Sequence, residues 1–120
     1  MGRGIFCALI FVLVAQIAEG RAEFQANTYT KHHQTYPAVA MNAAGDFIVA
    51  WRSHLADGRG GGVYARHFHA DGTPAGGEFA VSDLGVDVAS WSPGVGLSAG
   101  GDAVIAWVAV EDGDRDIMAR

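Results

Sequence analysis

Cysteine is almost absent from the sequence, because the only one, Cys7, lies in an apolar run near the N-terminus. The rest of the chain therefore has no thiol that could form a disulfide bond, bind zinc or act as a nucleophile. Lysine is equally scarce, with Lys31 alone, and 13 acidic side chains face 8 basic ones. Without a basic stripe, neither nucleic acid nor an anionic membrane surface is an expected partner.

Long apolar runs are also lacking, apart from residues 5–18. This run is shorter than the roughly 20 residues that span a membrane, and it suits the roughly 7–15-residue core of a secretory signal. Small residues offer cleavage after Gly20 or Ala22, and we favour Ala22. An uncleaved anchor is disfavoured by the short run and by Gln16 within it. We assign residues 1–22 to a helical signal peptide and expect a secreted or cell-surface protein with no membrane span after cleavage.

One stretch of the chain occurs twice. PAVAMNAAGDFIVAW, at residues 37–51, returns as PGVGLSAGGDAVIAW at residues 93–107, an offset of 56. Seven pairs are identical, including the first proline and the last tryptophan, and most of the others exchange residues of similar size. Self-similarity over roughly 20–50 residues marks solenoids, propellers and arrays, and this offset lies just above that range. We interpret the stretch as an internal repeat.

The composition and pattern of the chain favour strands. Glycine accounts for 17 of 120 residues, and no segment after residue 22 keeps a 3.6-residue apolar period. Short apolar runs between Gly, Asp, Asn and Pro are typical of all-β proteins. Both faces of the second strand are apolar, so we expect burial on both sides, with Trp51 and Trp107 in the core. We expect four antiparallel strands in one unit, at residues 37–41, 47–51, 62–69 and 77–82.

A four-stranded unit that buries both faces matches one blade of a β-propeller. The signal peptide would be followed by an isolated strand (23–27) and loop that fill residues 23–36, a complete unit at 37–82 and a truncated unit at 83–120. The second unit stops inside its third strand, where Ala119 aligns with Ala65. Because a propeller closes with about four to eight blades, we expect an incomplete propeller whose open sheet edges favour self-association.

Several motifs of the chain resemble a known kind of repeat. They are EFQAN at residues 23–27, PAVAM at 37–41, GDFIVAW at 45–51, GVYARHF at 62–68 and DGTPAGGEF at 71–79. Together they resemble the tandem repeats of about fifty residues in large exported bacterial proteins of surface or adhesion type. The resemblance implies a β-propeller-like fold and supplies no catalytic residues. The chain departs from the pattern at Asn42, Ala44 and His69, where acidic residues are usual. These departures argue against ion binding at those turns.

The residues nearest to a metal site are Asp112, Asp114 and Asp116, which carry carboxylates at alternate positions as a calcium loop does. Ile117 stands where an EF-hand needs glycine, so we favour an acidic, solvated loop and expect no metal or other cofactor, with calcium as the ion to test. His67 and His69 share one strand face, but no third ligand follows at a recognisable spacing.

No residue of the chain is assigned a catalytic role. Ser53 and His54 are adjacent, and no Gly-x-Ser-x-Gly motif accompanies them. Trp91, expected in a loop, is the tryptophan freest to bind a ligand. We expect an exported, non-enzymatic β-repeat protein, structural or binding a protein or glycan at the cell surface. Two alternatives stay open: a fragment of a propeller-fold hydrolase of the sialidase type, whose usual Ser-x-Asp-x-Gly-x-Thr-aromatic turn residues 69–74 do not fit, and a calcium-stabilised surface repeat.

Overall fold

A computed structural model of the chain describes residues 22–54, 61–82 and 89–120, with backbone alone at 89–91. The predicted signal peptide, residues 1–22, lies outside this description except for Ala22. The described part consists of strands, turns and extended segments, and it holds no helix long and apolar enough to cross a membrane.

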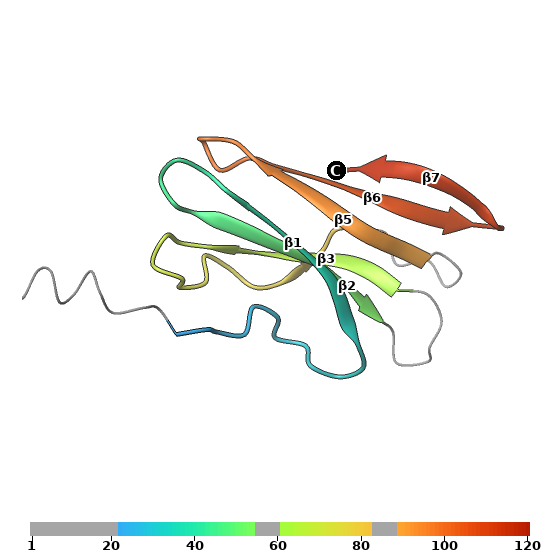
Figure 1. The fold of residues 1–120 in the computed structure, drawn as a ribbon, viewed down its shortest axis with the longest axis horizontal. Coiled ribbons are helices and arrows are strands. Elements are labelled where there is room, and N and C mark those ends of the chain that lie inside the picture. Colours follow the sequence, from blue (N-terminus) through green and yellow to red (C-terminus); the bar gives the residue numbers. More distant parts are fainter. Residues whose placement is uncertain (1–21, 55–60, 83–88) are drawn as a thin grey trace, which may run out of the picture.

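Within the described residues, seven strands form two antiparallel sheets (Figure 1). A single parallel pair, Gly61 with Ala89, joins the two sheets at one corner. For the described residues, the predictions of an all-β fold and of antiparallel pairing within each sheet are confirmed. The first sheet comprises, in spatial order, β1 (Gln34–Met41), β2 (Phe47–His54), β3 (Gly61–Phe68) and β4 (Phe79–Ala80). The second comprises β5 (Ala89–Leu97), β6 (Ala103–Glu111) and β7 (Asp114–Ala119).

Three strand predictions need correction. β1 begins at Gln34 and not at Pro37, and β4 is only two residues long where residues 77–82 were expected. Beyond β4 the Val81 amide still donates to the carbonyl oxygen of Val63, at 2.7 Å. The strand expected at residues 23–27 is wrong, because that segment pairs with no strand among the described residues. It lies on the face of the first sheet, where Phe24 packs against Phe47 and Phe68.

The hairpins β1–β2 and β5–β6 share one irregularity. In β1, Tyr36 and the proline after it lie opposite Trp51, and in β5, Ser92 and the proline after it lie opposite Trp107. The two residues before the prolines have positive φ angles, 53° at Tyr36 and 46° at Ser92. Proline cannot donate to a strand ladder, so each hairpin accommodates it in a β-bulge.

The turns of the two hairpins match as well. The amide of Asp46 donates to Asn42 Oδ1 at 3.1 Å, and the amide of Asp102 donates to Ser98 Oγ at 3.0 Å. Gly45 and its counterpart at position 101 have φ angles of 89° and 90°, a region that side chains other than glycine rarely adopt.

The core lies between the two sheets. The strands β2 and β6 occupy the same position in the repeat, but they turn opposite faces toward this core. At the offset of 56, Ile48 of β2 corresponds to Val104 of β6, yet the core residue of β6 is Ile105. Successive residues of a strand point to opposite faces. The even-numbered side chains of β2 therefore meet the odd-numbered side chains of β6. The cluster consists of Ile48, Ala50, Val63, Ala65 and Val81 from the first sheet and its last segment, and Ile105 and Trp107 from the second.

Candidate functional site

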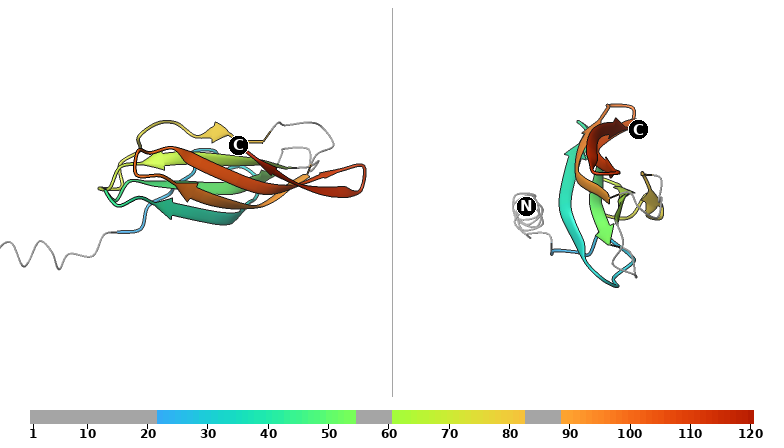
Figure 2. Two further views of the ribbon diagram at one scale, coloured as in Figure 1. Left: turned by 90° about the horizontal axis from the view of Figure 1, so that it is seen from above. Right: turned by 90° about the vertical axis from the view of Figure 1, so that its right-hand side faces the viewer.

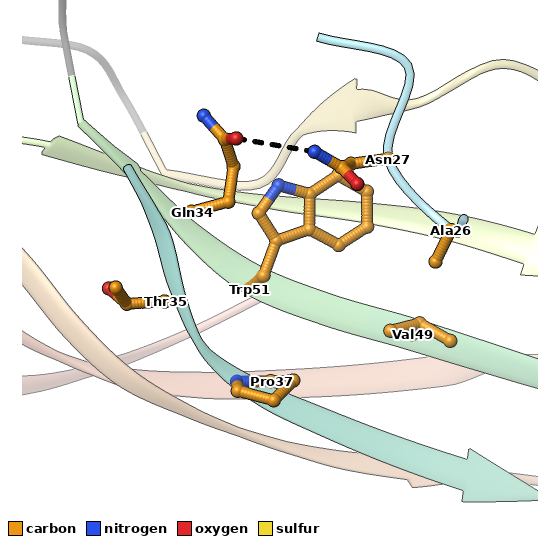
Figure 3. A pocket seen from close by; sticks show the side chains of 7 residues that line it. All are labelled: Ala26, Asn27, Gln34, Thr35, Pro37, Val49 and Trp51. Atoms are coloured by element: carbon orange, nitrogen blue, oxygen red, sulfur yellow. Dashed lines mark hydrogen bonds between the residues drawn. The ribbon is translucent and has the colours of Figure 1, made fainter. Parts of the chain in front are cut away.

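The outer face of the first sheet, turned away from the second sheet, carries a pocket around Trp51 (Figure 3). Its volume is about 180 Å3. Its lining comes from three elements: Ala26 and Asn27 of the segment before β1, Gln34, Thr35 and Pro37 of β1, and Val49 and Trp51 of β2. Figure 3 shows the indole between the two amide side chains on one side and Val49 and Pro37 on the other. We call this the Trp51 pocket.

Residues 22–33, the N-terminal segment, form one wall of the pocket and run along the first sheet on the side away from β5–β7 (Figure 2). The Phe24 ring lies 5.4 Å from that of Phe68, between centroids, and Phe68 in turn stacks on Phe47 at 5.1 Å. One guanidinium nitrogen of Arg66 donates to the carbonyl oxygen of Ala26 at 3.3 Å. These contacts hold the segment against the sheet, and Trp51 is left 5% exposed.

Neutral amides form the polar rim of the Trp51 pocket. The Asn27 Nδ2 donates to Gln34 Oε1 at 3.3 Å and to the carbonyl oxygen of Tyr29 at 2.8 Å. The Gln34 Nε2 donates to the carbonyl oxygen of Lys31 at 2.8 Å and to Ser53 Oγ at 3.4 Å. An aromatic ring beside amides can bind a sugar or a peptide group and carries no acid–base function. The volume lies below the roughly 300–1,000 Å3 of ligand pockets, so the pocket suits one small group of a larger ligand.

Two histidines meet at the end of the β1–β2 ladder. The His33 and His54 rings lie edge to face with centroids 5.9 Å apart, and the His54 amide donates to the carbonyl oxygen of His33 at 2.9 Å. Burial lowers the pKa of His54 below its usual value, and Arg52 and His33 add to the effect. The sequence does not indicate this pair, because its pattern predicts that β1 begins three residues later than it does. The register of Gln34 with Ser53 brings the two histidines together.

The adjacent Ser53 and His54 do not form a nucleophile and base. As neighbours on β2 they point to opposite faces of the sheet. Ser53 is buried and its hydroxyl accepts the bond from Gln34. The hydroxyl therefore helps to position the Gln34 side chain at the rim of the Trp51 pocket.

A second hollow, of about 340 Å3, lies where β3 ends, and it brings together His67, His69 and Asp46. His67 stacks on Phe79 with ring centroids 6.0 Å apart. The Asp46 Oδ1 accepts a hydrogen bond from the Ala70 amide at 3.1 Å, so this carboxylate anchors the turn after β3. Across residues 22–54, 61–82 and 89–120, no group of three or more His, Cys, Asp or Glu side chains is placed to hold a metal ion.

The three aspartates of the predicted acidic loop lie on the β6–β7 hairpin. Asp112 begins the turn, with a φ of 50°, while Asp114 and Asp116 belong to β7. All three are exposed. The expectation that Trp91 lies in a loop is wrong, because β5 includes it and pairs it with Val108. The Trp91 side chain lies outside the described part.

Comparison of the chain with protein-family models, with curated proteins and with solved structures found no match. Function therefore has to be inferred from the residues and their arrangement.

Proposed function

We propose that the chain is an exported, non-enzymatic β-repeat protein whose sheets stack like propeller blades and which acts as a structural or binding module. The observation that carries this proposal is the packing of opposite faces, in which Ile48 of one sheet meets the side of the other that bears Ile105. Stacking of repeats in one direction brings unlike faces together, whereas two-fold sandwich packing brings like faces together. Each interior blade of a propeller is packed on both sides in this directional way.

A pair of arginine contacts supports the same direction of stacking. In the second sheet, Arg120 donates to the carbonyl oxygen of Val81, the residue just after β4, at 2.8 Å. In the first sheet, Arg66 donates to the carbonyl oxygen of Ala26 at 3.3 Å. Ala26 and Val81 are repeat counterparts, because each stands two residues after the phenylalanine of a Glu-Phe pair, Glu23-Phe24 or Glu78-Phe79. The N-terminal segment thus lies over the first sheet as the end of the first sheet lies over the second.

The chemistry of the Trp51 pocket favours recognition over catalysis. Its polar rim is made of the Asn27 and Gln34 amides, and its floor is the Trp51 indole. Because the pocket admits only a small group, we propose that it holds one part of a cell-surface glycan or protein.

Export is tested by expressing the full chain with a C-terminal tag in a bacterial host and fractionating the cells. We expect the tagged protein outside the cytoplasm, with an N-terminus at Glu23. Uncleaved protein confined to the cytoplasm would contradict the proposal.

Binding is tested on immobilised bacterial cell-surface glycans, with hydrolysis of a fluorogenic sialic acid glycoside measured in parallel. We expect retention on glycans without turnover, and weaker retention of Asn27→Ala. The matched control is Thr30→Ala, since Thr30 is an exposed residue of the same segment outside the pocket. Turnover of the glycoside would instead favour the sialidase-type alternative.

A further inference from the structure

Two outer faces of the chain are bare at positions whose repeat counterparts are buried. On the second sheet, Val104 of β6 is 62% exposed, whereas its counterpart Ile48 is 0% exposed. Ile117 of β7 is 76% exposed, whereas its counterpart Val63 is 0% exposed. The register supports this correspondence, since Ala119 lies opposite β6 as Ala65 lies opposite β2. We call the face that bears Val104 and Ile117 the tail face.

The other bare surface lies on the first sheet, along β1. Val39 and Met41 are each 64% exposed. Their counterparts on β5, Val95 and Leu97, pack against the core between the sheets. Val39 and Met41 pair across the ladder with Val49 and Phe47, so they share the face that holds the Trp51 pocket. We call the part of this face along β1 the head face.

We propose that a second copy of this chain covers these surfaces, the tail face of one copy packing on the head face of the next. The contact would repeat the one inside each chain. There, the face of β2 and β3 that bears Ile48 and Val63 packs on the face of β5 that bears Val95 and Leu97. The tail face is the repeat counterpart of the face that bears Ile48 and Val63. The head face is the repeat counterpart of the face that bears Val95 and Leu97. The inference rests on the blade-like stacking of the proposed function.

The N-terminal segment fits this contact and does not obstruct it. Within the chain, β4 pairs with β3, with Phe79 opposite Ala65. The counterpart of Ala65 is Ala119 of β7, and the counterpart of Phe79 is Phe24. In the described residues the outer edge of β7 pairs with no strand. Once the faces stack, residues 24–27 of one copy lie beside β7 of the other and add the fourth strand of its sheet, a form of strand addition.

Contacts between unlike faces form closed rings or open filaments, according to the rotation between copies. Each copy supplies two sheets, and a closed propeller holds about four to eight. A ring would thus hold about two to four copies. In every such ring each contact joins unlike faces, whereas an isologous interface joins the same face of both copies.

The test is sedimentation velocity of the purified full chain. A lysine in the middle of a buried apolar contact is strongly unfavourable, so Val104→Lys blocks the tail face and Met41→Lys blocks the head face. Both residues are exposed within one copy, so both variants should fold, which far-UV circular dichroism checks. The matched control is Ala99→Lys, which adds the same charge in the exposed turn between β5 and β6.

We expect the unaltered chain and Ala99→Lys to assemble, and each face variant alone to sediment as a monomer. An equimolar mixture of Val104→Lys and Met41→Lys should form a dimer and nothing larger, because each variant keeps the face that the other has lost. Assembly by either face variant alone, or a monomeric unaltered chain, would overturn the inference. Neither result depends on export or glycan retention, so the proposed function can fail or hold separately.

Discussion

The packing of opposite faces makes a sharp prediction for two residues at the same position of the repeat. Ile48 and Val104 lie 56 residues apart, in β2 and β6, and both are β-branched and apolar. Ile48 is 0% exposed in the core, while Val104 is 62% exposed on the tail face. Truncation to alanine should therefore destabilise the fold strongly at the first position and weakly at the second.

The magnitudes follow from burial. Ile48→Ala removes three carbons, worth about 2.4 kcal/mol at about 0.8 kcal/mol for each buried methylene. The cavity left behind raises the loss to about 3–4 kcal/mol, inside the roughly 2–5 kcal/mol of comparable substitutions. Val104→Ala removes two carbons that are mostly in water already. We expect a loss of about 0.6 kcal/mol at that position.

The measurement is urea unfolding followed by tryptophan fluorescence, at a protein concentration that keeps the chain monomeric. Trp51 and Trp107 are buried and report on both sheets. The urea midpoint should fall clearly for Ile48→Ala and remain nearly unchanged for Val104→Ala, with the same m-value. Equal losses at the two positions would refute the packing of opposite faces, since like faces would then be buried in both sheets.

Three further predictions concern the turns, the histidines and the core. Gly45→Ala should lower the thermal stability of the fold more than Gly101→Ala. Both glycines have left-handed φ angles, which cost a residue with a side chain about 1–2 kcal/mol. Only at Gly45 would a new Cβ also lie 3.0 Å from Ala70. The pKa of His54 is lowered in the folded chain, so the unfolded chain binds more protons and stability should fall as the pH drops below about 6.5; melting temperatures between pH 7 and 5 should show a smaller decrease for His54→Gln. Trp107→Ala should lower the free energy of unfolding by about 3–5 kcal/mol, and an unchanged denaturant midpoint would show that its burial is unimportant.

The order of strands within a unit could be predicted from local signals, because turns and apolar runs act over a few residues. Glycine with positive φ at position 45 marks the first hairpin turn, and β2 and β3 begin within one residue of the positions expected. The start of β1 could not be predicted in this way. Its ladder continues past Pro37 because Tyr36 adopts a φ of 53°, which is uncommon for an aromatic residue and follows from the pairing of the whole hairpin.

The Trp51 pocket depends on contacts between residues that are distant in the sequence, and here the local pattern was misleading. EFQAN, at residues 23–27, resembles the start of a fourth strand, but a strand needs an edge to pair with. In the described chain the nearest favourable contact is the aromatic surface of Phe47 and Phe68, on which Phe24 packs. That docking brings Asn27 to the side chain of Gln34 at the rim of the pocket, which no spacing in the sequence indicates.

Apolar patterning shows that a strand has two buried faces without showing what buries each of them. Both faces of β2 and of β6 are apolar, so the pattern is equally consistent with any direction of stacking. The structure separates the two faces of β6: Ile105 faces the first sheet, and Val104 faces outward. An apolar side chain such as that of Val104 contributes no hydrophobic stabilisation while it is exposed to water. Its repeat counterpart, Ile48, is buried by a neighbouring sheet. The exposure of Val104 is therefore best explained by a further sheet on the tail face, which is the contact that the lysine variants test.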